Sequence, residues 1–203
     1  MQSMTAAAPL RYVALGDSYT IGTSVAERER WPNQLVALEP RLQLVANLGV
    51  NGFTSRDLIE VELPQLDGLA PELLTVLIGV NDVVQGVPAE SYRANVMRIL
   101  DDAVDRVGAD RVLVVTTPDY TVTPSGSDYG DPAEQSAGIH ENNAIIAEVA
   151  RGLGINVVDI VDISLGAGSD RTLVAVDGLH PSGAQYARWV ERIAPAVAAM
   201  LEP

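Results

Sequence analysis

The feature that most constrains the fold of this chain is a repeated alternation of short, continuous apolar runs with longer amphipathic segments. The runs are rich in Val, Leu and Ile without regular polar interruption, which is typical of strands buried on both faces. The predicted strands are residues 12–15, 42–46, 73–78, 112–116 and 155–158. The predicted helices between and after them are residues 31–38, 55–63, 89–107, 131–153 and 182–201.

Strands that alternate with helices predict a parallel sheet covered on both sides. We therefore expect an α/β fold, a three-layer α/β/α sandwich around a mostly five-stranded parallel sheet. The helical pattern is clearest in segment 89–107, where apolar residues recur every three or four positions. In the last predicted helix we expect the apolar side chains to lie in the core: Trp189, Val190, Ile193 and Val197.

The composition is that of a globular protein with one full core. The chain has 203 residues, 47% hydrophobic and 20% charged, which predicts a single domain over residues 1–203, with residues 1–10 as a flexible N-terminal segment. The 27 acidic and 13 basic side chains give a formal net charge of -14. This balance argues against broad electrostatic binding of nucleic acid or an anionic membrane.

The chain has no cysteine and only two histidines, His140 and His180. Disulfides, thiolate nucleophiles and Cys-ligated metals are thereby excluded, and a His-based metal cluster is improbable. No basic leader with an apolar run precedes the first strand, and no apolar run approaches the roughly 20 residues that span a bilayer. We expect a cytoplasmic protein that does not insert into membranes, with secretion still open if a leader has been removed.

Polar and glycine residues follow the first three predicted strands. Ligands of parallel α/β sheets bind beyond the carboxyl ends of the strands, so these positions are the first candidates for chemistry. Ser18 follows the first strand, Gly49 and Gly52 follow the second, and Asn81 follows the third. Each has an ordinary alternative explanation, because Ser and Asn also cap helices and Gly also forms turns.

Near the C-terminus, Asp177 and His180 lie three positions apart on a turn before the last helix. This spacing can bring the carboxylate to imidazole Nδ1, which fixes the tautomer and favours the imidazolium. A surface turn is the alternative for His180. His140 lies within a helical pattern without such a partner, and we interpret it as a solvated helix residue.

One long stretch, residues 117–132, is rich in Pro, Gly, Ser and Asp. Long loops are often lids or binding walls, and the alternative is a mobile surface excursion.

Together, the strand ends and the last turn supply a serine, an imidazole, a carboxylate and candidate oxyanion donors. These are the parts that serine-based acyl transfer needs. Two other classes fit the same layers: a catalytically inactive acyl- or sugar-binding module, and a doubly wound nucleotide-binding protein. The second is disfavoured because the chain lacks G-x-G-x-x-G and Walker sequences at the appropriate strand ends.

Four blocks resemble the SGNH (GDSL-type) hydrolase superfamily: "ALGDSYTIG", "NLGVNGFTSRDL", "IGVND" and "DGLHPSGAQY". They occur in the family's order and span the chain from about Tyr12 to the last helix. Tyr19 replaces the leucine of the GDSL name, and Phe53 follows the glycine of the second block. The resemblance implies the residue roles listed here: Ser18 as nucleophile, Gly52 (with Gly49 as the alternative) and Asn81 as oxyanion donors, Asp177 as orienting acid and His180 as base.

The resemblance implies a serine hydrolase that cleaves carboxylic esters through an acyl-enzyme, with neither metal nor organic cofactor. We expect a small-molecule ester of short acyl chain. The same machinery would also suit a thioesterase, a lysophospholipase or a carbohydrate O-deacetylase. If the long loop folds over the cleft, an acyl pocket would be formed by four side chains: Phe53, Tyr120, Val122 and Tyr129. The oligomeric state is left open.

Overall fold

The computed structural model describes residues 8–202. Its centre is a five-stranded, wholly parallel sheet in the order β2-β1-β3-β4-β5. The strands are β1 (Leu10–Gly16), β2 (Leu42–Asn47), β3 (Leu73–Leu77), β4 (Val112–Val115) and β5 (Asn156–Val158). The predicted sheet is therefore confirmed. Of the N-terminal segment predicted to be flexible, residues 1–7 lie outside the described residues, and Leu10 begins β1.

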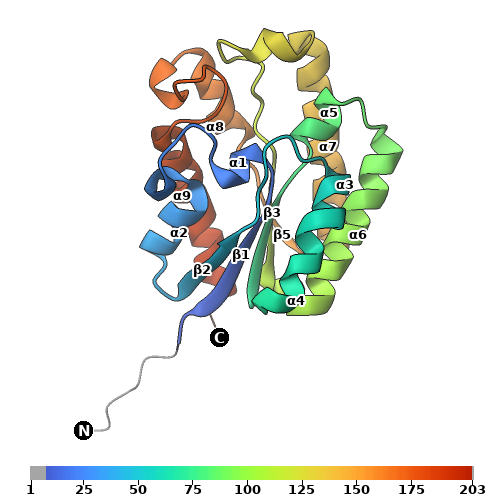
Figure 1. The fold of residues 1–203 in the computed structure, drawn as a ribbon, viewed down its shortest axis with the longest axis vertical. Coiled ribbons are helices and arrows are strands. Elements are labelled where there is room, and N and C mark those ends of the chain that lie inside the picture. Colours follow the sequence, from blue (N-terminus) through green and yellow to red (C-terminus); the bar gives the residue numbers. More distant parts are fainter. Residues whose placement is uncertain (1–7, 203) are drawn as a thin grey trace, which may run out of the picture.

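Helices cover both faces of the sheet, as Figure 1 shows. One face carries α2 (Trp31–Leu38), α8 (Val161–Leu165) and α9 (Gly183–Met200). The other carries α3 (Ser55–Asp57), α4 (Leu66–Leu69), α6 (Ala89–Val107) and α7 (Pro132–Gly152). Two short helices, α1 (Ser18–Ile21) and α5 (Val80–Val84), lie where β1 and β3 end. The three-layer α/β/α arrangement is confirmed.

The sheet separates two hydrophobic cores. The core on the α2/α9 face includes Trp31, Leu35, Tyr186 and Trp189. The core on the other face includes Leu58, Tyr92, Ile99 and Ile146. The side chains predicted to be buried in the last helix are buried, with Trp189, Ile193 and Val197 at 0% exposure. Burial of these large side chains is the main stabilising contribution to both layers.

The predicted helix 55–63 is not a regular α-helix. It begins as α3, passes into a π-helical turn at Leu58–Glu62 and continues as a 3₁₀ turn at Leu63–Gln65. Pro64 lacks a backbone N–H and so cannot continue the α-helical bonding pattern. Glu62, the last residue of the π-helical turn, is buried, and its carboxylate accepts a hydrogen bond from the Gly16 N–H at 2.9 Å.

The order of the strands brings three turns together. β1 lies between β2 and β3. The chain runs from β1 to β2 on one side and then crosses to β3 on the other side, so the switch point of the sheet lies at the carboxyl ends of β1 and β3. The turns that carry Ser18, Gly52 and Asn81 follow β1, β2 and β3 respectively. Adjacent strands therefore deliver these three residues to one place.

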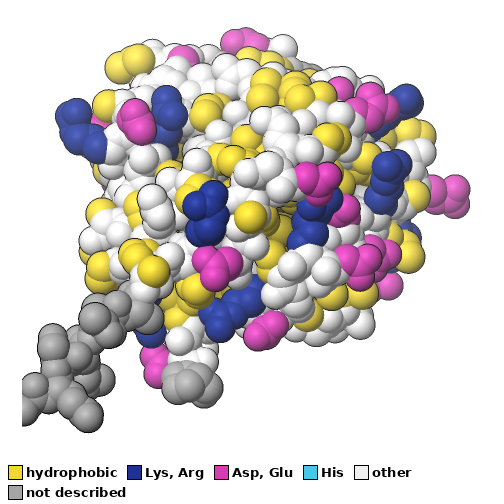
Figure 2. All heavy atoms as spheres, turned by 60° about the horizontal axis from the view of Figure 1, so that its bottom comes forward, with side chains coloured by type: hydrophobic (Ala, Val, Ile, Leu, Met, Phe, Trp, Pro, Cys, Tyr) yellow, Lys and Arg dark blue, Asp and Glu magenta, His cyan; other side chains and the backbone are white. Residues whose placement is uncertain are grey.

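Figure 2 shows the end of the molecule opposite to these three turns, which is the bottom of Figure 1 turned toward the viewer. On the described part of this face, basic side chains lie among acidic and hydrophobic ones rather than in a separate basic patch. No helix within residues 8–202 combines the length and apolarity needed to cross a membrane.

Gly16 is required where β1 turns toward Ser18. Its φ is +150°, and a Cβ there would overlap the Leu77 carbonyl oxygen and the Thr20 hydroxyl. We therefore expect Gly16→Ala to lower the free energy of unfolding by about 3 kcal/mol or more, measured by urea denaturation.

Gly68→Ala is the matched control, because a Cβ at this helical glycine meets nothing within 4 Å. It should leave stability unchanged or raise it by up to about 1 kcal/mol. Equal stability of the Gly16→Ala variant and the wild type would contradict the close packing of this turn.

Candidate active site

Ser18 begins α1 directly after the turn that ends β1. Asp17, not Ser18, is the N-cap: its Oδ1 accepts a hydrogen bond from the Tyr19 N–H at 2.9 Å. The Ser18 hydroxyl is thus not used as a cap, and it makes no hydrogen bond to another described residue. Ser18 is 7% exposed and lines a cavity at the end of the sheet. The capping alternative for its side chain does not apply.

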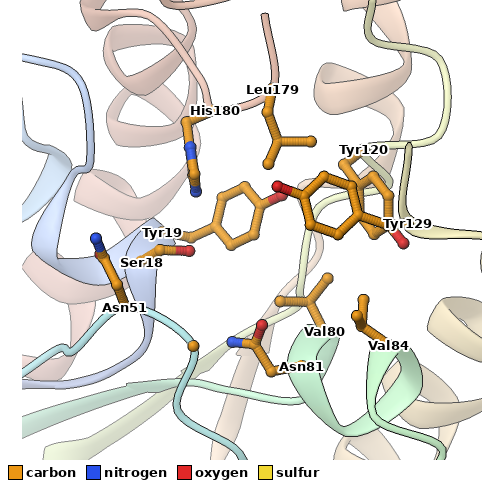
Figure 3. Close-up of a pocket in the computed structure, with 11 residues that line it drawn as sticks. Ser18, Tyr19, Asn51, Val80, Asn81, Val84, Tyr120, Tyr129, Leu179 and His180 are labelled. Atoms are coloured by element: carbon orange, nitrogen blue, oxygen red, sulfur yellow. The ribbon is translucent and has the colours of Figure 1, made fainter. Parts of the chain in front are cut away.

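Asp177 and His180 form a close pair on the loop before α9. Asp177 Oδ2 lies 2.7 Å from His180 Nδ1, and Oδ1 accepts hydrogen bonds from the backbone N–H groups of Leu179 and His180 at 2.9 and 3.0 Å. Figure 3 shows the imidazole with its other end directed toward the Ser18 hydroxyl. The pair holds the ring in an orientation suited to accept a proton from Ser18.

Opposing influences act on the ionisation of Asp177. Partial burial disfavours its charge, but hydrogen bonds from Ser24, the Leu179 amide and His180 outweigh burial and lower the pKa of Asp177 to about 2. The carboxylate is therefore charged throughout the neutral range and can stabilise an imidazolium on His180.

Gly52 occupies a tight turn in which the Phe53 N–H bonds the Val50 carbonyl oxygen at 3.2 Å. Its φ of +81° in the third position is the signature of a type II turn, which favours glycine. Its backbone N–H donates to none of the described residues. Gln85 Nε2 donates to the Gly52 carbonyl oxygen at 3.0 Å and fixes the turn from the side of α5.

Gly49 has a different position from Gly52. It is buried against the Asp17 carbonyl oxygen and the Ile21 nitrogen, where a Cβ would lie 2.7 Å from both atoms. Gly49 therefore allows the second turn to pack against α1, and it does not line the cavity, whereas Gly52 does.

Asn81 reaches the same cavity from α5. Its Nδ2 donates to the Phe53 carbonyl oxygen at 2.9 Å, which fixes the side-chain amide. An amide nitrogen has two N–H groups, so one remains for a ligand. Together with the N–H groups of Ser18 and Gly52, it forms a set of donors from three adjacent strand ends.

The cavity has a volume of about 210 Å³. Figure 3 shows the side chains of its lining, with the serine, asparagine and histidine at one end and aromatic and aliphatic groups at the other. The lining consists of Ser18, Tyr19, Asn51, Gly52, Val80, Asn81, Val84, Tyr120, Tyr129, Leu179 and His180.

Of the side chains predicted to form an acyl pocket, Tyr120 and Tyr129 line the cavity, with ring centroids 5.8 Å apart in an edge-to-face arrangement. The expectation that Phe53 and Val122 also line it was wrong. Val122 is directed toward Gly168, 3.2 Å from the position of a Cβ there. Phe53 lies beyond Gly52 and contributes its carbonyl oxygen to Asn81 instead of a side chain to the lining.

The first part of the loop over residues 117–132 is packed beside the cavity, whereas residues 127–132 are exposed. Thr117, Asp119 and Tyr120 are buried, and Asp119 accepts hydrogen bonds from Thr121 and Ser136. The Tyr120 hydroxyl donates to Gln135 at 2.8 Å. Anchoring to α7 holds Tyr120 in place, so this part of the loop is part of the scaffold.

The sequence analysis did not identify four further residues that line the cavity, Asn51, Val80, Val84 and Leu179. All four lie within or beside the motif blocks, close in sequence to Gly52, Asn81 or His180. This proximity could have indicated them, but the direction of each side chain depends on turn geometry. Tyr19 stands beside His180, with ring centroids 5.3 Å apart.

His140 lies apart from this site. It is on α7 with its side chain 56% exposed, as expected of a solvated helix residue. It borders a second hollow of about 510 Å³ between α7, β5 and α8. Within residues 8–202, no three His, Asp or Glu side chains are grouped closely enough to hold a metal ion.

Two buried carboxyl groups lie beneath Ser18. Asp17 and Glu62 are both 0% exposed, and Asp17 Oδ2 and Glu62 Oε1 have no hydrogen-bond partner among the described residues. Burial raises the pKa of Asp17 to about 8 and that of Glu62 to about 9, and the charge of Asp17 adds to the shift of Glu62. Both groups therefore favour the neutral form at pH 7.

Comparison with protein families gives a match that covers most of the chain. The model of the GDSL-like Lipase/Acylhydrolase family matches residues 14–188 of this chain. Comparison with curated proteins gave no match.

Solved structures share the fold. A putative lipolytic protein of the G-D-S-L family from Desulfitobacterium hafniense has a TM-score of 0.72 at 19% identity, covering 92% of this chain and 99% of its own. A variant of an acetyl xylan esterase from Geobacillus stearothermophilus has a TM-score of 0.73 at 17% identity, with 96% and 97% covered. A lipase/acylhydrolase from Enterococcus faecalis has a TM-score of 0.70 at 23% identity, with 96% and 98% covered.

The buried carboxyl groups make stability depend on pH. The pKa values of Asp17 and Glu62 are raised in the folded protein. Between pH 5 and 8 the unfolded chain has therefore already released most of the protons that the folded protein still keeps. Their contribution to the free energy of unfolding therefore falls as pH rises through this range. Glu62→Gln keeps an acceptor for Gly16 but cannot ionise. From pH 5 to pH 8 its stability should therefore fall less than that of the wild type, by up to about 4 kcal/mol.

The measurement is urea denaturation at pH 5 and pH 8. Glu60→Gln is the control, because Glu60 lies exposed on the same turn and pairs with Arg56. It should retain the wild-type pH dependence. If the Glu62→Gln variant and the wild type lose the same stability over this range, the buried carboxyl does not titrate as described.

Proposed function

The chain belongs to the GDSL-like lipase/acylhydrolase family of carboxylic ester hydrolases, and from this premise we propose that it cleaves short-chain esters through an acyl-enzyme on Ser18. The observation that carries the proposal is the Asp177–His180 pair, joined at 2.7 Å, whose imidazole faces the same cavity as Ser18, Gly52 and Asn81. Nucleophile, base, orienting acid and oxyanion donors are thus available at one site.

In the first half-reaction, Ser18 Oγ attacks the ester carbonyl carbon while His180 accepts the hydroxyl proton. Asp177 stays ionised and stabilises the imidazolium that forms. Collapse of the tetrahedral intermediate breaks the bond to the alcohol, which leaves with the proton from His180. The acyl group remains esterified to Ser18.

Negative charge develops on the former carbonyl oxygen during this attack. The free N–H groups of Ser18 and Gly52 and the second N–H of Asn81 Nδ2 would donate to it. They are fixed before substrate binds, by α1, by the type II turn and by the bond from Asn81 to Phe53. Fixed donors stabilise the transition state without reorganisation, and each typically contributes about 10² to 10³ in rate.

In the second half-reaction, a water molecule replaces the alcohol. His180 takes a proton from the water as it attacks the acyl carbon, and then returns a proton to Ser18 Oγ as the bond to the acyl group breaks. The products are the alcohol, the carboxylic acid and the regenerated serine.

The size of the cavity supports a short acyl chain. Its volume of about 210 Å³ is bounded by Val80, Val84, Tyr120, Tyr129 and Leu179, which favours a small apolar acyl group. Acetyl is the group removed by an acetyl xylan esterase, the activity named for one of the solved structures with this fold. An O-acetylated carbohydrate is therefore the alternative substrate that a specific observation favours.

Hydrolysis of p-nitrophenyl acetate by the wild type and by the Ser18→Ala variant tests the proposal. We expect turnover by the wild type and its loss in the variant, with circular dichroism showing both proteins folded. Equal turnover by the two folded proteins would exclude Ser18 as nucleophile. A parallel panel of thioesters, lysophospholipids and acetylated oligosaccharides identifies the leaving group.

Tyr129 should limit the length of the acyl chain. Its ring is 44% exposed at the rim of the cavity, so truncation is compatible with folding. Tyr129→Ala should raise the ratio of kcat/KM for hexanoate over acetate esters about tenfold, because apolar space is opened. Tyr129→Phe keeps the ring and should retain the wild-type ratio. A ratio unaffected by Tyr129→Ala would show that the acyl chain lies elsewhere.

A further inference from the structure

Two consecutive hydroxyl side chains follow the helix that carries Ser18, and each bonds to a different loop of the candidate site. Thr23 Oγ1 donates to Asn51 Oδ1 at 2.5 Å, across 28 positions of sequence. Ser24 Oγ donates to Asp177 Oδ2 at 2.6 Å, across 153 positions. Neither residue belongs to the resemblance blocks, and neither lines the cavity.

The backbone of this segment is held tightly to Ser18. The N–H groups of Gly22 and Thr23 both donate to the Ser18 carbonyl oxygen, at 3.0 and 3.1 Å. Ser24 has a φ of +65°, one of two positive values among the described residues other than glycine. For a residue other than glycine, such a conformation costs free energy, and it is kept only where contacts with the surrounding structure hold it in place. The bond to Asp177 is the contact that Ser24 gains in this conformation.

We propose that Thr23 and Ser24 are positioning residues that couple the nucleophile segment to the oxyanion turn and to the acid–base loop. The proposal rests on the proposed function, because it assigns these two residues to the geometry of Ser18, Gly52 and the Asp177–His180 pair. Through them, one short segment sets the relative positions of three loops that come from distant parts of the sequence.

Ser24 acts on Asp177 in two ways. Its hydroxyl and His180 Nδ1 share Oδ2 of the carboxylate, while the two backbone amides take Oδ1. These bonds fix the orientation of the carboxylate, and Oδ2 divides its hydrogen bonding between Ser24 and His180. Without this hydroxyl, Oδ2 would interact with His180 alone, would hold the imidazolium more strongly and would be less restrained.

The other ionisable groups near this pair come from the elements packed around the loop. Tyr19 on α1 lies beside the His180 ring at a tilted angle. The pKa of Tyr186 on α9 is raised by burial and by the charges of Asp17 and Asp177, against the opposing effect of Arg30. The hydroxyl of Ser125 lies 3.5 Å from the Asp177 carbonyl oxygen. Of the side chains in the described residues, only Ser24 and His180 donate to the Asp177 carboxylate.

Thr23 acts on the other loop. Asn51 directly precedes Gly52 in the type II turn and lines the cavity. The bond from Thr23 fixes the Asn51 side chain, and with it the turn that aims the Gly52 N–H at the oxyanion position. Loss of this bond should weaken transition-state stabilisation without changing the charge around His180.

Two variants remove the hydroxyls without adding strain. Glycine adopts a φ of +65° freely, so Ser24→Gly removes the hydroxymethyl group, and the donor with it, without adding backbone strain. Thr23→Val preserves the branched shape. The control is Ser169→Ala, because the Ser169 hydroxyl bonds only its own turn at Gly166. The measurements are the pH profile of kcat/KM for p-nitrophenyl acetate, kcat at pH 8, and the proton NMR signal of the His180 Nδ1–H.

For Ser24→Gly we expect kcat to fall about tenfold and the acid limb of the profile to move about half a pH unit upward, because the unshared carboxylate favours the imidazolium. The Nδ1–H signal should move downfield. For Thr23→Val we expect kcat to fall about tenfold with the acid limb and the NMR signal unchanged. Ser169→Ala should match the wild type in all three.

An acid limb and an NMR signal that stay unchanged or move the other way in Ser24→Gly would overturn the role of Ser24. Undiminished kcat in Thr23→Val would overturn that of Thr23. The NMR signal reports the Asp177–His180 bond whether or not Ser18 is the nucleophile. Failure of the proposed function is recognised separately, by turnover that survives in Ser18→Ala.

Discussion

The parallel pairing of β1 with both β2 and β3 is the constraint on which the site depends. Parallel neighbours end at the same edge of a sheet, so the turns after three adjacent strands must meet. Those turns carry Ser18, Gly52 and Asn81. The loop before α9 adds the bonded Asp177–His180 pair, and α9 is anchored by the buried Trp189 and Ile193. The two cores thus stabilise the distances on which chemistry would depend.

The fold places the carboxyl groups around the Ser18 turn in opposite environments. Asp177 accepts four hydrogen bonds at the rim and is held ionised. Asp17 and Glu62 are sealed under the end of β1, where burial favours their neutral forms. Asp177 therefore interacts with the imidazole as a charged group. Asp17 and Glu62 accept hydrogen bonds from the Tyr19 and Gly16 N–H groups without adding negative charge near Ser18.

Much of this arrangement is readable from the sequence. Continuous apolar runs identify all five strands, and the spacing of apolar residues predicts α6 with its observed bounds, Ala89–Val107. The topology rule for parallel sheets then brings the motif residues to one edge. The structure places Ser18, Gly52, Asn81 and His180 around one cavity, and Asp177 is bonded to His180. The chemical roles of these five residues remain predictions.

What the sequence does not reveal depends on backbone angles and on contacts between loops. Periodicity does not reveal that Asp17 rather than Ser18 caps α1, nor that Val122 lies against Gly168. The bonds of Thr23 and Ser24 join segments that no periodicity relates. The π-helical turn that brings Glu62 beneath Gly16 is likewise hidden in a segment whose apolar spacing predicts an ordinary helix.

The most direct test of the account is to label the protein with a fluorophosphonate and locate the adduct by mass spectrometry of its peptides. A serine activated by a neighbouring imidazole reacts with this reagent, and an unactivated one does not. The account predicts one adduct, on Ser18, that is lost in a folded His180→Ala variant. Labelling of another residue, or no labelling of a wild type that hydrolyses esters, would contradict it.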